Sequence, residues 1–343
     1  MRKFLNIKPT GMSAHIDSSP PWTRRKLLQF GIFGLGATVA TTAIARYALN
    51  SPSAIVRVPP LPDDRPDAGN GIDPMTFLRS FETGTLKREN GRTVREFHLT
   101  AHTTPIQLNR FTPFITWNYN GQVPGPTLRV TEGDWVRVVF HNQGGHSHSV
   151  HFHGIHSAEA DGVRPIRNGE TEVYEFQAKP FGVHLYHCHV EPVTRHLGKG
   201  MYGMFIVDPP EGRPPADEIV IVMSGYDLDD NRGNELYAFN GIPDYYLDRP
   251  IPIQQGQLVR LYLLNMVEFD PALTFHIHAN FFQVYRTGRT LKPSEDTDVI
   301  TLGTTERHIL EFQYDYPGRF MFHPHQDWIA EHGCMGNFEV VEA

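Results

Sequence analysis

One short motif, a cysteine between two histidines, constrains this chain more than any other feature of the sequence. His187-Cys188-His189 is followed by His196 and Met201. A thiolate, an imidazole and a thioether are the ligand set of a blue-copper electron-transfer site once a second histidine joins them. Neighbouring side chains of an extended segment point to opposite faces, so Cys188 can face one metal while both flanking histidines face another. The motif therefore predicts two metal sites that are linked through one residue.

The histidine content of the chain supports metal binding. The 343 residues include 19 histidines, most of which gather in four short pieces. Such clusters are typical of metal sites, whereas surface and core histidines are usually scattered. The two cysteines are too few for a disulfide framework. The formal net charge is -7 and the body of the chain has no run of Lys or Arg. We therefore expect no nucleic acid as a partner, because binding it needs a basic footprint.

Residues 1–50 have the features of an export signal rather than of a folded domain. Arg24 and Arg25 precede an apolar stretch that ends in a small-residue cleavage site. The segment resembles a twin-arginine signal. We therefore expect export by the twin-arginine route and a periplasmic or extracellular protein. The apolar stretch is just about long enough to span a bilayer, so a membrane anchor formed by an uncleaved signal stays open.

The rest of the chain predicts a linker followed by two β-domains. Residues 51–75 are rich in Pro and Asp and predict an extended linker. Short alternating or β-branched runs then follow, separated by Gly and Pro, which favours an all-β sandwich or barrel. The Pro-rich segment 209–215 is the natural boundary between domains at residues 76–210 and 217–343. The runs that we expect to form strands include residues 93–100, 127–130, 135–142, 172–177 and 204–207, and in the second half residues 258–264, 308–312 and 337–341.

The two halves repeat each other, and what differs between the copies carries the chemistry. His148 precedes the first H-x-H motif by three residues, whereas Leu273 stands at the matching place in the second half. Cys188 is matched by Pro324, which has no donor atom. Duplication followed by loss of one site is the economical explanation, and His332 is then a remnant. The corresponding motifs are Tyr119-Asn120-Gly121 and Phe239-Asn240-Gly241, His151-Phe152-His153 and His276-Ile277-His278, and His187-Cys188-His189 and His323-Pro324-His325.

With four histidine motifs in this order, the sequence resembles the multicopper oxidases, specifically the small two-domain, laccase-like members with type 1 copper in the first domain. The resemblance covers roughly residue 75 to the C-terminus and implies an all-β fold of two cupredoxin-like Greek-key β-sandwich domains in tandem. It also implies four copper ions per chain: one type 1, one type 2 and two type 3. By this resemblance the type 1 ligands are His148, Cys188, His196 and Met201, the type 2 ligands are His151 and His276, and the type 3 ligands are His153, His187, His189, His278, His323 and His325.

The resemblance implies a laccase-like oxidase that couples one-electron oxidation of a reductant to the four-electron reduction of O2 to water. Phenols, aromatic amines and metal ions are all open as reductants, and so is a small redox protein. Asp161 is the acidic residue best placed by the resemblance to orient the type 2 water and relay protons, although an ordinary Asp-Gly turn would explain it equally well. Asp327 is a weaker candidate.

Two other functions compete with the oxidase. A copper-containing nitrite reductase shares the two-domain plan, but it needs only one catalytic copper with three histidines. His153, His189 and the pair His323 and His325 would then have no role. A non-catalytic copper carrier would need the type 1 ligands alone. The number of histidines therefore favours the oxidase.

The oligomeric state can be predicted from the same histidine motifs. Each chain has one half with the type 1 ligands and one half without them. Its trinuclear cluster would therefore have to close against a neighbouring chain through a head-to-tail interface. By resemblance the ring is a homotrimer.

The remaining histidines are expected to be ordinary polar or surface residues, and Cys334 a small buried one. These histidines are His98, His102, His141, His146, His156, His184 and His308.

Overall fold

The computed structural model describes residue 71 and residues 73–342. The predicted export signal and almost all of the predicted linker lie outside these residues. Within the described part of the chain, no helix is long and apolar enough to cross a membrane.

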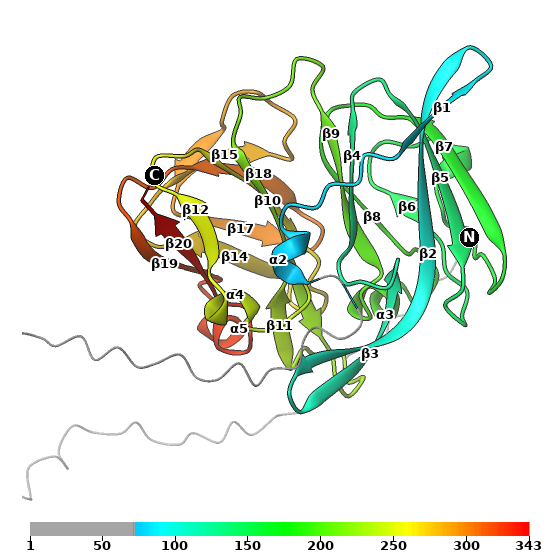
Figure 1. Cartoon of the computed structure of the whole chain (residues 1–343). Coiled ribbons are helices and arrows are strands. Elements are labelled where there is room, and N and C mark those ends of the chain that lie inside the picture. Colours follow the sequence, from blue (N-terminus) through cyan, green and yellow to red (C-terminus); the bar gives the residue numbers. More distant parts are fainter. Residues whose placement is uncertain (1–70, 72, 343) are drawn as a thin grey trace, which may run out of the picture. The chain divides into compact units, whose positions relative to one another are not determined.

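The first half of the chain is a sandwich of two sheets (Figure 1). Its strands follow from alternation between buried and more exposed side chains. Along residues 135–142 every second side chain is buried, and Val136, Val138 and Phe140 lie in the core between the sheets. One sheet consists of β1 (Thr85–Glu89), β2 (Arg92–Asn109), β5 (Trp135–Asn142) and β7 (Thr171–Gln177) in that order, with β3 (Thr112–Tyr119) paired to β2. The other consists of β4 (Gly125–Thr131), β9 (Tyr202–Asp208), β8 (Gly182–His187) and β6 (His151–Phe152).

The second half repeats this architecture. In both halves a parallel strand pair is followed by an antiparallel partner: β2, β5 and β7 correspond to β10, β13 and β18. The larger sheet has the order β11 (Leu236–Phe239), β10 (Asp217–Tyr226), β13 (Val259–Asn265), β18 (Arg307–Phe312), β15 (Phe282–Arg286) and β16 (Glu295–Thr297). The smaller has the order β12 (Ile251–Gln254), β20 (Gly336–Val341), β19 (Gly318–His323), β14 (Ala272–Ile277) and β17 (Val299–Gly303). The all-β, two-sandwich prediction is confirmed.

The helical segments of the described residues are short. They are α2 (Pro74–Phe77), a 3-10 turn at Ala158–Ala160, α3 (Val193–Gly198), α4 (Tyr245–Asp248) and α5 (Asp327–Glu331).

An apolar interface joins the halves. Every residue of β8 is buried, because one face of this strand packs into the first core and the other against the second half. Such two-sided burial explains why β9 is almost continuously apolar. The side chains in this interface include Val183, Leu185, Met204 and Ile206 from the first half and Val220, Val222, Tyr262 and Leu264 from the second.

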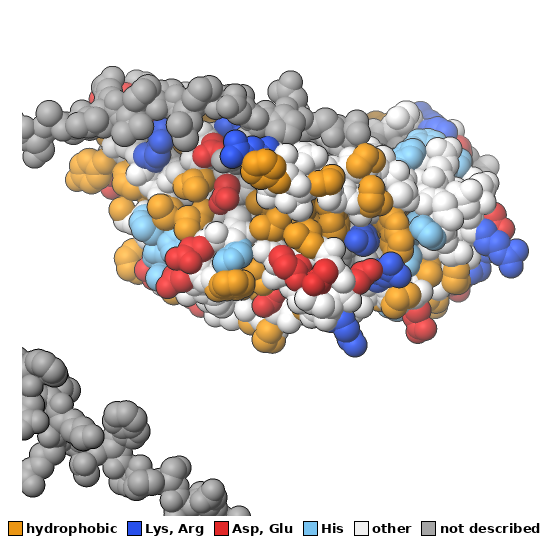
Figure 2. Space-filling model, turned by 90° about the horizontal axis from the view of Figure 1, so that it is seen from below, with side chains coloured by type: hydrophobic (Ala, Val, Ile, Leu, Met, Phe, Trp, Pro, Cys, Tyr) orange, Lys and Arg blue, Asp and Glu red, His pale blue; other side chains and the backbone are white. Residues whose placement is uncertain are grey.

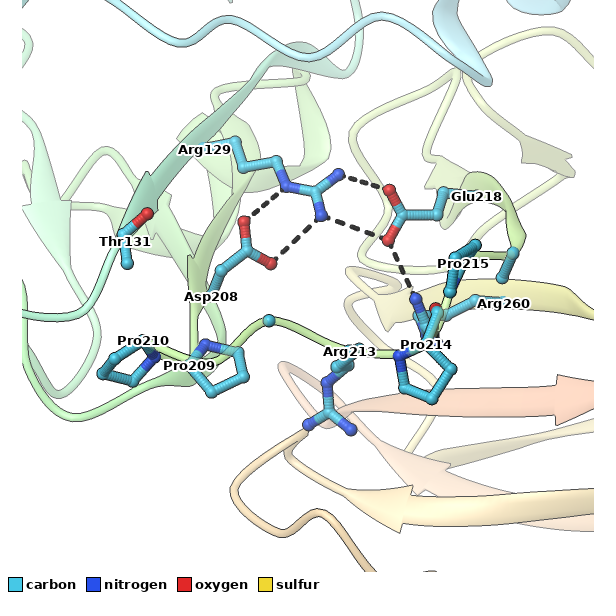
Figure 3. Close-up of a pocket in the computed structure, with 12 residues that line it drawn as sticks. Arg129, Thr131, Asp208, Pro209, Pro210, Arg213, Pro214, Pro215, Glu218 and Arg260 are labelled. Atoms are coloured by element: carbon cyan, nitrogen blue, oxygen red, sulfur yellow. Dashed lines mark hydrogen bonds and ion pairs between the residues drawn. The ribbon is translucent and has the colours of Figure 1, made fainter.

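Ion pairs secure the junction between the halves (Figure 3). The Arg129 guanidinium bonds Asp208 at 2.7 Å and Glu218 at 2.6 Å. Arg260, which is almost fully buried, bonds Glu218 at 3.2 Å and Glu311 at 2.6 Å. The Pro-rich segment predicted as the domain boundary lines a cavity of about 370 Å³ beside these pairs. The Arg129–Glu218 pair joins the first half directly to the second.

The first described residues form a strap across the second half. The Asp73 carboxylate caps α2 by accepting the backbone N–H groups of Met75 and Thr76, and it also accepts the Tyr245 hydroxyl at 2.6 Å. Leu78 is fully buried in the second core, and its carbonyl accepts the Val220 N–H at 2.9 Å. From the sequence, these positions were predicted to belong to the linker and the first domain. The structure instead packs them on the second half.

A long hairpin, β2 and β3, is the other feature that the sequence analysis did not anticipate. It extends from the first half to the second, where Ile106, Leu108 and Phe114 pack against Tyr226 and Ala238 (Figure 1). The Phe114 and Tyr226 rings meet edge to face at 5.1 Å.

Candidate metal centres

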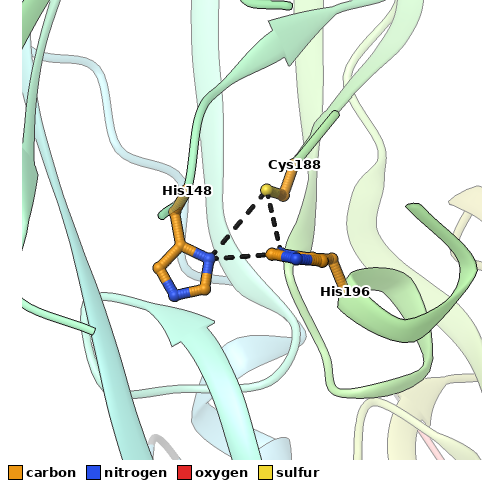
Figure 4. A group of neighbouring side chains, drawn as sticks. All are labelled: His148, Cys188 and His196. Carbon is orange, nitrogen blue, oxygen red and sulfur yellow. Dashed lines mark hydrogen bonds between the residues drawn. The ribbon is translucent and has the colours of Figure 1, made fainter. Parts of the chain in front are cut away.

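Cys188, His148 and His196 form a compact triangle of donor atoms (Figure 4). The Cys188 Sγ atom lies 3.2 Å from His196 Nδ1 and 4.0 Å from His148 Nδ1, and the two Nδ1 atoms are 3.2 Å apart. A metal ion bonded to all three at about 2.0–2.3 Å would need these atoms roughly 3.5–3.8 Å apart. The donor set and its spacing therefore fit one small metal ion after minor adjustment.

Backbone pairing brings the four predicted type 1 residues together. His148 exchanges backbone hydrogen bonds with Ile166 just before β6. Cys188 follows β8, and His196 lies on α3. The Cys188 N–H donates to the Met201 carbonyl at 3.0 Å, and the Met201 N–H donates to the His196 carbonyl at 3.1 Å. Met201 is fully buried in the same cluster as Cys188.

Burial controls the protonation of this triangle. Cys188 and His148 are fully buried, and His196 is 4% exposed. Burial lowers the pKa of His148 to about 3 and that of His196 to about 4, so both imidazoles are neutral and free to bind metal at neutral pH. Burial raises the pKa of the Cys188 thiol, while the Ser149 N–H approaches the sulfur at 3.4 Å. Metal binding would therefore displace a proton from Cys188.

Trp117, on the hairpin strand β3, covers this triangle and was not singled out from the sequence. Its ring lies 4.8 Å from the His196 ring and 5.6 Å from the His148 ring. His146 packs on the same indole at 4.8 Å and stays outside the donor triangle. Gly144 is required here, because a Cβ atom would come within 2.6 Å of the His148 ring. Close packing thus fixes the imidazole orientation.

A first histidine cluster lies at the ends of β6 and β8. It contains His151, His153 and His187, and the His153 and His187 Nε2 atoms are 2.9 Å apart. Burial lowers the pKa of His153 to about 3 and that of His187 to about 4. The His189 ring lies 5.1 Å from the His151 ring, at the edge of the same cluster.

A second histidine cluster has the same design in the second half. It contains His276, His278 and His323, with 3.1 Å between the His278 and His323 Nε2 atoms. The His325 ring lies 4.7 Å from the His276 ring. Burial lowers the pKa of His278 and of His323. This cluster is more open to solvent, because His278 and His325 are exposed.

A hydrogen bond links the cysteine triangle to the first cluster. His187 Nδ1 donates to the carbonyl of Cys188 at 2.8 Å, which fixes the tautomer and leaves Nε2 free. His323 makes the same bond to the Pro324 carbonyl at 2.7 Å. The second half has therefore kept the histidine geometry although it has lost the cysteine.

Two carboxylates flank the clusters at equivalent places. Asp161 accepts from His151 Nδ1 through its backbone carbonyl at 2.7 Å, and its carboxylate lies 3.1 Å from the same nitrogen. In the second half the Asp298 carbonyl accepts from His276 Nδ1 at 2.8 Å, with its carboxylate at 3.6 Å. Asp161 was predicted from the sequence, whereas Asp298 was not. His156, for which we expected an ordinary polar role, has its Nε2 atom 3.5 Å from the Asp161 carboxylate.

Among the described residues, no hydrogen bond or ring contact joins a histidine of the first cluster to one of the second. Figure 2 shows exposed histidine side chains near both ends of one face of the molecule. The two clusters are therefore separate groups within the described chain.

The place that corresponds to the cysteine triangle in the second half holds packing residues. Leu273 is fully buried in the second core, and Cys334 is fully buried as expected. His332 donates to the Trp328 carbonyl at 2.7 Å, and its ring lies tilted against the Trp328 ring at 3.6 Å. Of the histidines expected to be ordinary, His184 is buried between two backbone carbonyls.

Two sandwiches of one topology, one Cys-His-His triangle and two mirrored histidine clusters define a metalloprotein built from tandem cupredoxin-like domains. Comparison with known proteins identifies the class: residues 100–212 and residues 213–343 each match a family model described as multicopper oxidase. The chain belongs to the multicopper oxidase family.

Individual relatives within this family have different activities. A crystal structure of a multicopper oxidase is 48% identical, with a TM-score of 0.77, and the match covers 79% of this chain and 98% of that one. The blue copper oxidase from Nitrosomonas europaea is 29% identical, with a TM-score of 0.65, over 72% of this chain and 86% of that one. The copper-containing nitrite reductase of Neisseria gonorrhoeae is 30% identical over 254 residues, which cover 66% of this chain and 63% of that protein. The chain thus spans less than two thirds of this curated relative's length.

Proposed function

We propose that the chain is a laccase-like oxidase, which takes electrons singly from a reductant and uses four of them to reduce O2 to water. The observation that carries this proposal is the second histidine cluster, His276, His278 and His323, which mirrors the first down to the 3.1 Å and 2.9 Å spacings of the paired Nε2 atoms. A protein with one catalytic copper and three histidine ligands would not need both complete clusters.

In this proposal the donor sets divide into two kinds of site. The buried triangle, with Met201, holds the type 1 copper, and His151 and His276 hold the type 2 copper. Bound copper would supply one-electron transfer at the cysteine site and O2 reduction at the histidine clusters. The type 3 ligands are His153, His187 and His189 of one half and His278, His323 and His325 of the other, for four copper ions per chain.

The chain's own residues connect and serve these sites. His187 is bonded covalently to Cys188 and also donates a hydrogen bond to its carbonyl, which gives two short routes from the cysteine to the cluster. Asp161 accepts from His151 Nδ1 through its carbonyl and orients that ring. Its carboxylate, 40% exposed, reaches both His151 and solvent. This placement suits a group that passes protons to the cluster.

Nitrite reduction is the competing function, because curated relatives at 30% identity are copper-containing nitrite reductases. A test should follow O2 uptake by the copper-loaded protein with an artificial electron donor, together with peroxide, nitrite consumption and copper content. We expect O2 uptake without accumulated peroxide and about four copper ions per chain. Nitrite turnover without O2 uptake, with about two copper ions, would favour the reductase. One copper and neither reaction would indicate a carrier.

We also propose that the active form is a homotrimer in which the first cluster of one chain faces the second cluster of the next. The two clusters of one chain do not touch in the described structure, and each is bordered by an exposed apolar side chain. Val163 near Asp161 is 51% exposed, Phe281 near His278 is 62% exposed, and Trp328 near His325 is 61% exposed. Association would cover these side chains and complete each ligand set.

Complementation tests the shared site. A first-half variant, His151→Ala with His153→Ala, and a second-half variant, His323→Ala with His325→Ala, should each be inactive. Mixed trimers reassembled from both should regain activity at the interfaces that combine two intact halves. A fully active monomer in light scattering would contradict the model, and so would a lack of complementation despite proven subunit exchange.

Export by the twin-arginine route to the periplasm or extracellular space is part of the same proposal and rests on residues 1–50 alone. Replacing Arg24 and Arg25 with Lys should leave the protein in the cytoplasm, which fractionation would detect. Unchanged export of this variant would indicate that the protein uses another export route. Membrane extraction of the wild-type protein would separate a cleaved signal from an anchor.

A further inference from the structure

A cleft opens on the outer side of α3, the short helix whose inner side carries His196. Its volume is about 440 Å³, and it lies between this helix and the 227–232 loop of the second half, with Phe269 at its border. A helix with its side chains is about 10–12 Å across, so the cleft lies within roughly that distance of the His196 ring. The Arg195 guanidinium, at the cleft, lies over the Trp117 ring at 5.7 Å. The cleft therefore adjoins the proposed electron-entry site.

The charged side chains of the cleft do not balance. Asp227 is 9% exposed, and its carboxylate accepts the backbone N–H groups of Asn231 and Arg232. The Asp230 carboxylate bonds Arg195 at 3.3 Å. Both acidic groups are thus already engaged. Within the described residues, no carboxylate forms an ion pair with Lys199 or with the Arg232 guanidinium.

Lys199 is half-buried and lies outside the ion pairs of the described residues. Its ammonium group lies over the Phe114 ring at 4.1 Å. An anion in the cleft would replace the water that this ammonium group has lost. The cleft thus presents two cations to a negatively charged ligand.

The border of the cleft is aromatic and conformationally constrained. Phe269 has a backbone φ of 70°, and Arg232 has the same value. A positive φ is unfavourable for residues with a side chain, and for a bulky one it is a genuine outlier. Such conformations persist where the surroundings impose them, and they cluster at ligand sites. An aromatic ligand would lie against Phe269.

We propose that this cleft binds the reducing substrate and that the substrate is a phenol carrying a carboxylate group. The carboxylate bonds Lys199 and Arg232, and the ring lies against Phe269 near α3. Since a cavity of about 150 Å³ holds one benzene ring, the cleft has room for a substituted ring and its side chain. The inference rests on the oxidase function proposed above and specifies its substrate class.

The reaction balances with O2 as the only oxidant. Each phenol loses one electron and its hydroxyl proton and becomes a phenoxyl radical. Four such oxidations supply the four electrons and four protons that convert one O2 into two water molecules. The carboxylate takes no part in the transfer and serves only to position the ring.

Calorimetry on the copper-loaded protein tests the site without turnover. The probes are 4-methoxybenzoate, which lacks the oxidisable hydroxyl group, and its uncharged methyl ester. We expect the acid to bind about tenfold more tightly than the ester, since a charge-assisted hydrogen bond contributes about that factor. Lys199→Gln and Arg232→Gln should each bring the ratio of the acid's affinity to the ester's affinity close to one. Lys292→Gln, which removes an exposed lysine elsewhere on the second half, should leave the ratio unchanged.

The outcomes separate this inference from the proposed function. If acid and ester bind equally, or if Lys292→Gln lowers the ratio as much as Lys199→Gln, the cleft is not a site for aromatic acids, even when O2 uptake with an artificial donor proves the oxidase. If the ratio behaves as expected but no donor supports O2 uptake, the cleft is confirmed and the oxidase is wrong. Steady-state kinetics add a second readout: Lys199→Gln should raise KM for 4-hydroxybenzoate more than it lowers kcat.

Discussion

The two halves of the chain share a strand order, yet only the first brings a cysteine thiol and two imidazoles together. The Leu273 side chain fills the second core where His148 completes the triangle in the first. Pro324 replaces Cys188, but its carbonyl still accepts from His323 as the Cys188 carbonyl does from His187. A metal site can thus be lost by changing side chains, while the backbone geometry that serves the neighbouring cluster persists.

The same comparison extends to solvent exposure. His153 and His189 of the first cluster are partly buried, whereas their counterparts in the second cluster, His278 and His325, are exposed. The first cluster is therefore shaped within its own chain. The second depends more on whatever covers it, which agrees with the proposed contact between chains.

Replacing the two cysteines should have opposite results, and this is the largest effect that we expect. Cys188→Ser should abolish the blue absorption and oxidase turnover while three copper ions per chain remain, because the thiolate is lost and both histidine clusters are intact. Cys334→Ser should keep colour, copper content and turnover. Visible spectra and copper analysis would measure this. A Cys188→Ser protein that stays blue would remove the type 1 assignment.

Acid should loosen the copper-free first half before the second. The folded-state pKa values of His148, His187 and His196 are about 3 to 4, below the unfolded value of about 6.5. The unfolded chain then binds more protons below pH 6.5, so stability falls as the pH drops from 6.5 toward 4, by about 1.4 kcal/mol per unit for each such histidine.

Hydrogen exchange would show where this loss occurs. Amides of β6 and β8 should exchange faster at pH 5 than at pH 7 after correction for intrinsic rates. Those of β13, in the second core, should change less, since His308 is the one second-half histidine whose pKa is lowered as far, to about 4. Copper loading should protect the first half. Equal loosening of both halves would mean that the buried histidines do not control acid stability.

The two flanking carboxylates should differ in their effect on turnover. Asp161→Asn should lower kcat about 10- to 100-fold, the range found for residues that support metal ligands. Asp298→Asn should cost less than about threefold, because its carboxylate is farther from the histidine, at 3.6 Å against 3.1 Å. Both variants keep the backbone carbonyl that orients the ring. Copper content and the pH profile of kcat would distinguish a defect in proton transfer from loss of metal. Equal losses of kcat in the two variants would contradict the expected difference between the two carboxylates.

The smallest expected effect concerns the two methionines. Met201→Leu should leave the protein blue and raise the type 1 reduction potential, because a weak donor that favours the oxidised metal is removed. Met335→Leu, at the corresponding place in the second half, should leave the potential unchanged. Redox titration of the blue band measures both. An unchanged or lower potential in Met201→Leu would assign the axial position to another residue.

Local patterns explain what could be predicted from the sequence. The run at residues 135–142 alternates in the sequence and in the structure, and the H-x-H spacing places both histidines of each motif in one cluster. The features that were missed depend on residues far apart in the chain. Trp117 meets His196 only because the hairpin crosses the sandwich, and Asp298 meets His276 across paired strands. No local periodicity records such contacts.

The strap formed by Asp73 to Leu78 constrains the order in which parts of the chain can fold during synthesis. These residues leave the ribosome before either sandwich, yet the core that receives Leu78 contains side chains as late as Phe338 and Val340. The strap can therefore dock only after synthesis is nearly finished. An early segment of the polypeptide closes the last part of the fold, so truncation at the C-terminus would also release the beginning of the chain.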